Sequence, residues 1–187
     1  MRLEVITGPM FAGKTHALVE RAKARDAHEV AAFRLVPWLE SPTAPGWLEP
    51  RGGVPYPAMQ LRLSRVTPSE DTLRIEHTLS AALERHPLVL VDEAHFSVAP
   101  GFGLHERRFS ARTLVLAGLS LTWDGKPWEP FAWLVHHADD VRVLRARCAR
   151  CGGAAMYSQL AQGSAERVVR DTGRNYEPRC RACWEVA

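Results

Sequence analysis

The chain has 187 residues, of which 46% are hydrophobic, and its formal net charge is +3 at pH 7. This length and apolar fraction predict one domain of ordinary size plus a small appendage. No run of eighteen apolar residues occurs, and the first residues lead directly into a strand pattern, so we expect no membrane span, no secretory leader and a cytoplasmic location. Nine arginines between Arg142 and Arg181 favour either an anionic ligand, such as a nucleotide or nucleic acid, or a solvated basic surface.

A phosphate-binding loop is predicted near the N-terminus. Residues 3–7 have a strand pattern, residues 15–27 have apolar side chains at helical spacing, and the segment between them fits G-x-x-x-x-G-K-[ST]. In such loops backbone N–H groups surround phosphate oxygens, the lysine reaches the outer phosphates, and the hydroxyl holds Mg²⁺. The predicted nucleotide-binding residues are Gly8, Pro9, Met10, Phe11, Ala12, Gly13, Lys14 and Thr15.

The rest of the first 146 residues alternates strand and helix patterns. Residues 35–57 contain six prolines, so we expect an irregular segment there, and Thr67-Pro68-Ser69-Glu70 is typical of a helix start. This order predicts an α/β, RecA-like P-loop nucleotide-binding domain with a parallel sheet, whose ligands bind at the carboxyl ends of the strands. The expected strands are 30–33, 88–91, 113–117 and 141–144, and the expected helices are 67–85 and 129–138.

Two acidic residues follow the apolar strand at 88–91. In a phosphate-loop protein such a residue usually holds Mg²⁺, so Asp92 takes that role, and Glu93 is placed to accept a proton from the group that attacks the γ-phosphate. The alternative is that both are surface acids at a strand end. The run Asp92-Glu93-Ala94-His95 also spells a helicase motif, but such motors need two ATPase-type domains and this chain has room for one.

The four cysteines form two C-x-x-C pairs separated by 28 residues. Paired knuckles of this kind are typical of a tetrahedral Cys₄ zinc site, with two disulfides or spare thiols as the alternatives. We therefore predict a nucleotide-binding domain at 1–146 and a small zinc-ribbon-like domain at 147–187. Zinc would close a long loop and fix Tyr176 and its neighbours against the nucleotide domain. The predicted zinc ligands are Cys148, Cys151, Cys180 and Cys183.

These motifs together resemble the zinc-containing (type II) thymidine kinases. The resemblance is carried by the phosphate loop, by Asp92-Glu93-Ala94-His95-Phe96, by Ala117-Gly118-Leu119, by Gly125-Lys126-Pro127-Trp128 and by the run from Tyr176 to the last cysteine pair. It implies transfer of the γ-phosphate of ATP to the 5′-hydroxyl of thymidine, with Mg²⁺ and zinc, in a homotetramer that binds no nucleic acid. It further implies that Glu93 is the base and Lys14 a catalytic phosphate ligand, and that the nucleoside pocket is lined by Met10, Phe96, Leu119, Ser158 and Tyr176.

The chain departs from the family pattern at several positions. Ser120 replaces the usual aspartate after Gly-Leu, Leu160 replaces an arginine, and no Asp-x-Arg follows the second strand. Arg34 and Arg51 are the candidates to supply the missing positive charge near the phosphates. A diverged nucleotide-binding member with a regulatory or assembly role, and a nucleic-acid-stimulated ATPase, remain as alternative functions.

Overall fold

A computed structural model describes residues 1–37, 46–64, 68–96, 109–161 and 175–185. Its first half contains β1 (Arg2–Thr7), α1 (Lys14–Lys23), a 3₁₀ turn (Ala27–Glu29), β2 (Val30–Val36), β3 (Trp47–Leu48), β4 (Tyr56–Pro57), β5 (Met59–Arg62) and α2 (Pro68–Arg85). Its second half contains β6 (Leu88–Asp92), a 3₁₀ turn (Ala94–Phe96), β7 (Thr113–Gly118), α3 (Glu129–His137), β8 (Asp140–Val143), β9 (Ala146–Arg147), β10 (Ala154–Ala155), β11 (Tyr157–Leu160) and β12 (Tyr176–Arg179). Within these residues, no helix has the length and apolar character needed to span a bilayer.

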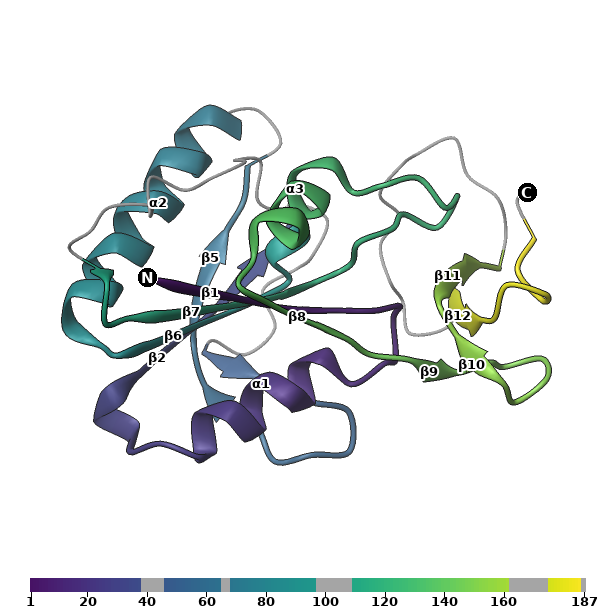
Figure 1. The fold of residues 1–187 in the computed structure, drawn as a ribbon, viewed down its shortest axis with the longest axis horizontal. Helices are drawn as coiled ribbons and strands as arrows, with labels where there is room; N and C mark the ends of the chain where they lie inside the picture. The colour runs from purple at the N-terminus through teal and green to yellow at the C-terminus, as the bar shows by residue number, and fades with distance from the viewer. Residues whose placement is uncertain (38–45, 65–67, 97–108, 162–174, 186–187) are drawn as a thin grey trace.

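A parallel six-stranded sheet forms the centre of the described structure, in the order β5-β2-β6-β7-β1-β8. Helix α1 covers one face, and α2 and α3 cover the other (Figure 1). The sequence prediction of a parallel α/β sheet is therefore confirmed. The phosphate loop follows β1 and Asp92 ends β6, two parallel strands separated by β7, so both lie at the carboxyl edge of the sheet, where ligands of parallel sheets bind.

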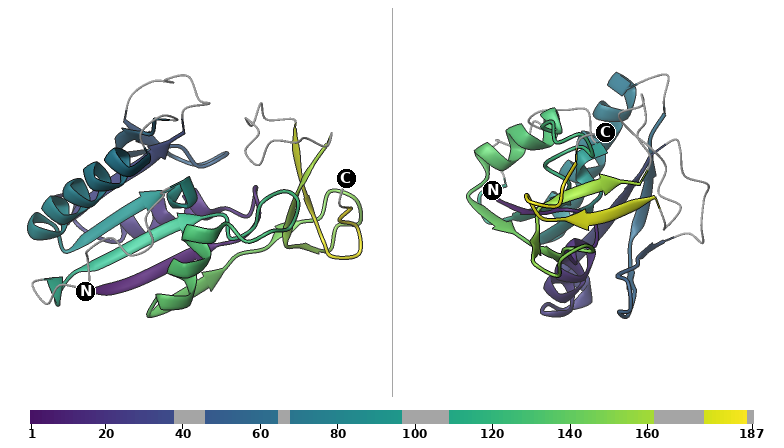
Figure 2. Two further views of the ribbon diagram at one scale, coloured as in Figure 1. Left: turned by 90° about the horizontal axis from the view of Figure 1, so that it is seen from above. Right: turned by 90° about the vertical axis from the view of Figure 1, so that its right-hand side faces the viewer.

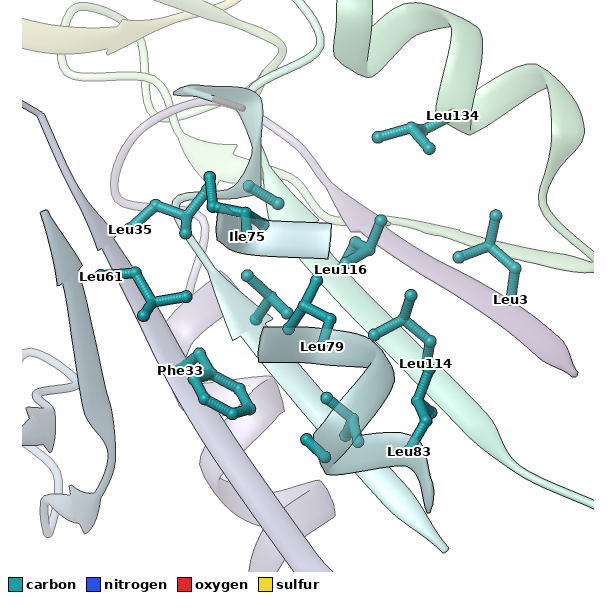
Figure 3. Close-up of a cluster of buried hydrophobic side chains, with 14 of the residues drawn as sticks. Leu3, Phe33, Leu35, Leu61, Ile75, Leu79, Leu83, Leu114, Leu116 and Leu134 are labelled. Atoms are coloured by element: carbon teal, nitrogen blue, oxygen red, sulfur yellow. The ribbon is translucent and has the colours of Figure 1, made fainter. Parts of the chain in front are cut away.

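Strand β6 explains how the core is divided between the two faces. All five of its residues are buried, as the continuous apolar run predicted. Because successive side chains of a strand point to opposite faces, Leu88 and Leu90 pack with α1, while Val89 and Val91 pack with α2 and α3. Figure 3 shows the second cluster, in which Leu79 and its neighbours on α2 rest on the strands.

Several element boundaries differ from the sequence prediction. Helix α1 ends at Lys23 rather than near residue 27, because Asp26 is already extended and the 3₁₀ turn leads into β2. Strand β2 continues to Val36, into the segment expected to be irregular, because it pairs with β5, which the sequence prediction missed. Helix α2 ends at Arg85, as expected, whereas its proposed N-cap Thr67 lies outside the described residues.

The C-terminal strands form a small separate arrangement. Strand β9 pairs with β10 and β11 pairs with β12, both antiparallel. Figures 1 and 2 show this unit beyond the sheet end at which β1 runs into the phosphate loop. We call residues 146–161 and 175–185 the C-terminal unit. The division into domains at 146/147 stays a prediction.

Candidate active site

The phosphate loop leaves β1 through a position that admits only glycine. Gly8 has a φ of +144°, and a Cβ added there would collide with the carbonyl oxygen of Leu144. Leu144 is itself held close because its N–H donates to the carbonyl oxygen of Thr7, at 2.7 Å. The backbone that follows β8 therefore packs tightly against the start of the loop. This close approach of two backbones explains why the first residue of the predicted motif is a glycine.

Lys14 turns its ammonium back into the curve of the loop. Its Nζ donates to the carbonyl oxygens of Gly8, at 3.1 Å, and Pro9, at 2.8 Å. Burial lowers the pKa of Lys14, and the negative charges of Glu93 and Asp92 act in the opposite direction. The ammonium is thus held where the loop N–H groups would surround a phosphate, with two carboxylates near enough to favour its charge.

A hydroxyl–carboxylate pair lies at the mouth of the loop. Thr15 Oγ1 donates to Asp92 Oδ2 at 2.7 Å, and the backbone N–H of Glu93 donates to Asp92 Oδ1 at 3.0 Å. Burial raises the pKa of Asp92, which the Thr15 hydrogen bond partly offsets. A threonine hydroxyl and a carboxylate in contact are the donor set that phosphate-loop proteins use for Mg²⁺. The pairing predicted for Thr15 and Asp92 is therefore present.

Glu93 occupies an unusual backbone conformation. Its φ is +57°, which is uncommon for a residue with a side chain and is often found at active sites. A 3₁₀ turn starts at once, closed by a hydrogen bond from the N–H of Phe96 to the carbonyl oxygen of Glu93 at 3.1 Å. The carboxyl edge of β6 thus presents one buried carboxylate, Asp92, and one partly exposed carboxylate, Glu93, side by side.

Both arginines suggested by the sequence lie near this edge. Arg34 is the register partner of Asp92 across β2 and β6, and its charge lowers the pKa of Asp92 as the last of several causes. The guanidinium carbon of Arg51 lies 4.3 Å from the ring centroid of Phe11, a cation–π contact with the phosphate loop. Positive charge therefore lies next to Asp92, from Arg34, and next to the loop, from Arg51.

The loop also contacts the C-terminal unit directly. The backbone N–H of Met10 donates to Ser158 Oγ on β11, at 2.9 Å. On the same hairpin, Tyr176 is buried and pairs with Leu160. Two residues predicted to line one pocket, Met10 and Ser158, are therefore brought together from opposite ends of the chain.

The four cysteines form one cluster in the C-terminal unit. Their Sγ atoms all lie within 4.8 Å of one another, and Cys151 Sγ lies 3.6 Å from Cys180 Sγ. Four thiolates about 2.3 Å from one zinc ion would be spaced like this, so the donor set fits tetrahedral zinc. All four are free thiols, which removes the disulfide alternative for this structure.

The electrostatics of the cluster also favour a cation. Backbone hydrogen bonds, first from Cys180, lower the pKa of Cys148 to about 6. Hydrogen bonds with Cys180 and Cys151 raise the pKa of Cys183 to about 12. The first thiol therefore ionises easily, whereas the last keeps its proton in hydrogen bonds with its neighbours. Because thiolates are the form that binds metal, a cation bound to all four would displace that proton.

Trp184, directly after the last cysteine, docks the C-terminal unit on the sheet domain. Within the unit its ring stacks on Tyr157, with centroids 4.3 Å apart, and across the boundary its Nε1–H donates to the carbonyl oxygen of Trp123, at 3.3 Å. A Cβ added to Gly125 would lie only 2.5 Å from the Trp184 ring, so the turn at 122–126 packs flat against it. The knuckle that would hold zinc is thus tied to the segment between β7 and α3.

A loop with a half-buried ammonium, a hydroxyl–carboxylate pair and a neighbouring partly exposed carboxylate is suited to phosphoryl transfer. Comparison with known proteins agrees with this chemistry. The family model described as thymidine kinase matches residues 60–184. The chain belongs to the thymidine kinase family.

Individual relatives align with nearly the whole chain. The thymidine kinase of Halobacterium salinarum is 30% identical, over 98% of this chain and 94% of its own length. Those of Rhodothermus sp. and Pyrobaculum aerophilum are each 29% identical, covering 98% and 96% of this chain and 81% and 96% of their own lengths. The thymidine kinase resemblance inferred from the sequence motifs is confirmed.

The structure shows different things about the predicted thymidine kinase site residues. The structure brings Thr15 into contact with Asp92, Met10 into contact with Ser158, and the four cysteines into one cluster. Phe96 and Leu119 are half-buried at the carboxyl edge of the sheet, after β6 and β7. The individual roles of Glu93, Phe96, Leu119 and Tyr176 stay predictions.

Sequence reasoning missed two residues that shape the site. Trp184 docks the C-terminal unit, and its only signal is its place directly after a knuckle. His95 was noted only within the helicase-like run and the run that carries the family resemblance, and no role was assigned to it, yet its side chain is 1% exposed and lies beside Glu93. The sequence signal for His95 is its place two residues after the proposed base. The apolar pattern of the preceding strand does not show that the imidazole is buried.

Proposed function

We propose that this chain transfers the γ-phosphate of ATP to the 5′-hydroxyl of thymidine, a reaction of pyrimidine salvage and DNA precursor synthesis. The observation that carries the proposal is the Thr15–Asp92 hydrogen bond at the mouth of the phosphate loop, with Glu93 next in the chain. Membership of the thymidine kinase family supports the choice of acceptor.

The phosphate loop and its neighbours would bind the phosphates of ATP. The loop N–H groups would donate hydrogen bonds to the phosphate oxygens. The Lys14 ammonium, which now donates to the carbonyl oxygens of Gly8 and Pro9, would donate to the outer phosphates instead. Mg²⁺, held by Thr15 and Asp92, would neutralise negative charge on the β- and γ-phosphates. Arg51, already held over Phe11, lies beside the loop as a further positive charge.

Glu93 is the proposed general base. Its carboxylate accepts the proton of the 5′-hydroxyl as that oxygen bonds to the γ-phosphorus, while the bond to the bridging oxygen breaks and ADP leaves. Because its side chain is 31% exposed, whereas Asp92 is buried, Glu93 is the carboxylate of the pair that a second substrate can reach. The products are thymidine monophosphate and ADP, with the proton on Glu93.

The nucleoside would lie between the sheet edge and the C-terminal unit. Phe96 is proposed to stack on the pyrimidine, with Met10, Leu119, Ser158 and Tyr176 around it. Support comes from the Met10–Ser158 hydrogen bond, which closes the loop against β11, and from the aromatic face of Phe96, since base–aromatic stacking is worth about 1–3 kcal/mol. The zinc-fitting cysteines would hold the hairpin that carries Ser158 and Tyr176.

The test is a nucleoside panel with the purified chain, ATP and Mg²⁺. Thymidine should yield thymidine monophosphate, and Glu93→Gln should lower kcat about 10²–10⁴-fold while ATP binding by calorimetry stays unchanged. Glu129→Gln, a change of the same kind on α3, is the matched control and should leave kcat unchanged. ATP binding without turnover of any pyrimidine deoxynucleoside would refute the proposal and favour the regulatory alternative.

We also propose a homotetramer located in the cytoplasm, without a nucleic-acid partner. The support is the family resemblance of the motifs. Light scattering should give a mass near four times the 20.9 kDa of one chain. ATP hydrolysis that rises with added DNA or RNA would count against this part of the proposal.

A further inference from the structure

His95 is a buried histidine packed among aromatic rings. Its ring lies 4.1 Å from that of Phe96 and meets the edge of Trp128 at 4.6 Å, nearly perpendicular, and its side chain is 1% exposed. Phe96 and Trp128 also pack on each other, with ring centroids 5.5 Å apart. The two aromatic side chains therefore fix the position of the imidazole within the 3₁₀ turn after β6.

The ring nitrogen Nδ1 of His95 lies beside the proposed base. It is buried and makes no hydrogen bond within the part of the chain that the structure describes. Its distance to Glu93 Oε2 is 3.6 Å, just beyond hydrogen-bonding reach. A buried polar nitrogen normally has a partner, and here a small rotation of the Glu93 side chain would supply one.

The imidazole is neutral in this environment. Burial, and secondarily the positive charge of Lys14, lower the pKa of His95 well below its ordinary value. Among the described residues, the charge of Lys14 acts on His95 and on Glu93, and the Asp92 carboxylate precedes Glu93 in the chain. A neutral imidazole carries one N–H, and a carboxylate next to Nδ1 favours the tautomer with the proton on that nitrogen.

We infer that His95 is a positioning residue, whose Nδ1–H donates to the Glu93 carboxylate and holds it toward the acceptor hydroxyl. The inference rests on the proposed role of Glu93 as the base. Glu93 lies in a left-handed backbone conformation at a strand end, and its side chain is partly exposed. The aromatic rings that hold His95 would give this carboxylate a hydrogen-bond donor at a fixed position.

A shape-matched pair of substitutions isolates the hydrogen bond. His95→Asn keeps an N–H donor close to the position of Nδ1, whereas His95→Leu has nearly the shape of asparagine and no donor. We expect kcat to fall about 10- to 100-fold in His95→Leu, with KM for ATP unchanged, and to recover most of that loss in His95→Asn. Equal kcat values in two folded variants would overturn the inference.

A double-mutant cycle separates this inference from the function on which it rests. In the Glu93→Gln background, His95→Leu should have little further effect on kcat, because the carboxylate that it orients is gone. Additive losses would overturn the positioning role and leave a structural one. Full activity of Glu93→Gln alone would refute the proposed base instead. If His95→Leu fails to fold, His95→Phe, which preserves an aromatic ring, replaces it in the same cycle.

Discussion

The sheet domain and the C-terminal unit are held together in different ways. The sheet lies between two extensive clusters of buried apolar side chains, one on each face. Among its described residues, the C-terminal unit has one small buried cluster, formed by Ala146, Cys148 and Ala155. One of its three members is a cysteine of the proposed metal site, so apolar burial contributes little there.

This difference shows where each region obtains its stability. Burial of apolar surface stabilises the sheet domain without any ligand. The C-terminal strands are two to four residues long and form two-stranded pairs, which are marginal in water without another constraint. Four clustered thiols supply that constraint when a metal binds them. The proposed active site lies across the boundary between the two regions, where Met10 contacts Ser158.

Removal of zinc should have the largest effect. Structural zinc contributes on the order of 10 kcal/mol in small metal-dependent folds, so chelation should unfold the C-terminal unit and abolish kinase activity. The main thermal transition of the sheet domain should persist. Metal analysis should give about one zinc per chain, and added zinc should restore activity, whereas added Mg²⁺ alone should not. A metal-free chain with full activity would show that the pocket is not anchored by metal.

A cavity in the sheet core should give the next largest effect. Leu79 on α2 is fully buried, so Leu79→Ala should lower the free energy of unfolding by about 2–5 kcal/mol, measured by urea denaturation. The control on the same helix is Leu73→Ala, because Leu73 is 57% exposed and its loss should cost under about 0.5 kcal/mol. Zinc content should be unchanged in both variants. Similar costs for the two variants would contradict the packing described for α2.

The contact between the two regions should matter less. Trp184→Ala removes the hydrogen bond to Trp123 and the packing on Gly125, as well as the stacking on Tyr157 within the C-terminal unit, so docking of that unit should weaken by about 1–2 kcal/mol. We expect faster amide exchange in β11 and a raised KM for thymidine, with zinc still bound. Trp184→Phe keeps a ring without the N–H and should have an intermediate effect. Unchanged exchange in both variants would mean that zinc alone docks the unit.

An exposed ion pair on the sheet domain should give the smallest effect. Arg21 donates to Glu4 at 2.8 Å, but its side chain is 48% exposed. Arg21→Ala should therefore cost no more than about 1 kcal/mol in the free energy of unfolding, and less at high salt. A loss as large as that of Leu79→Ala would indicate that charge, rather than apolar burial, holds α1 to the sheet.

The fold was predictable where the sequence pattern is set by burial. Leu88–Asp92 and Thr113–Gly118 are apolar because both faces of the sheet are covered, and this shows in the sequence. Strand β5 was not found, because it is four residues long, lies at the sheet edge and has one buried residue, Leu61. Its pairing with β2 depends on the register of two separated segments, which no local pattern records.

The site was predictable where a motif of fixed spacing is typical of one chemistry. The phosphate loop and the two cysteine pairs have fixed spacings, and the structure brings Thr15 to Asp92 and the thiols to one another. His95 and Trp184 could not be assigned in the same way. Their environment is built from Trp128, Gly125 and Tyr157, which are distant in the sequence and become neighbours only in the fold.

The position of β1 in the sheet has a consequence for how the protein is made. This strand leads directly into the phosphate loop, but its neighbours are β7 and β8, so Leu3 pairs with Leu114 and Thr7 with Val143. Strand β1 therefore has no partner in the sheet until β7 has been synthesised. Such distant pairing slows folding and leaves strand edges exposed to aggregation in the meantime. The proposed phosphate loop is thus translated well before the strands that hold it in place.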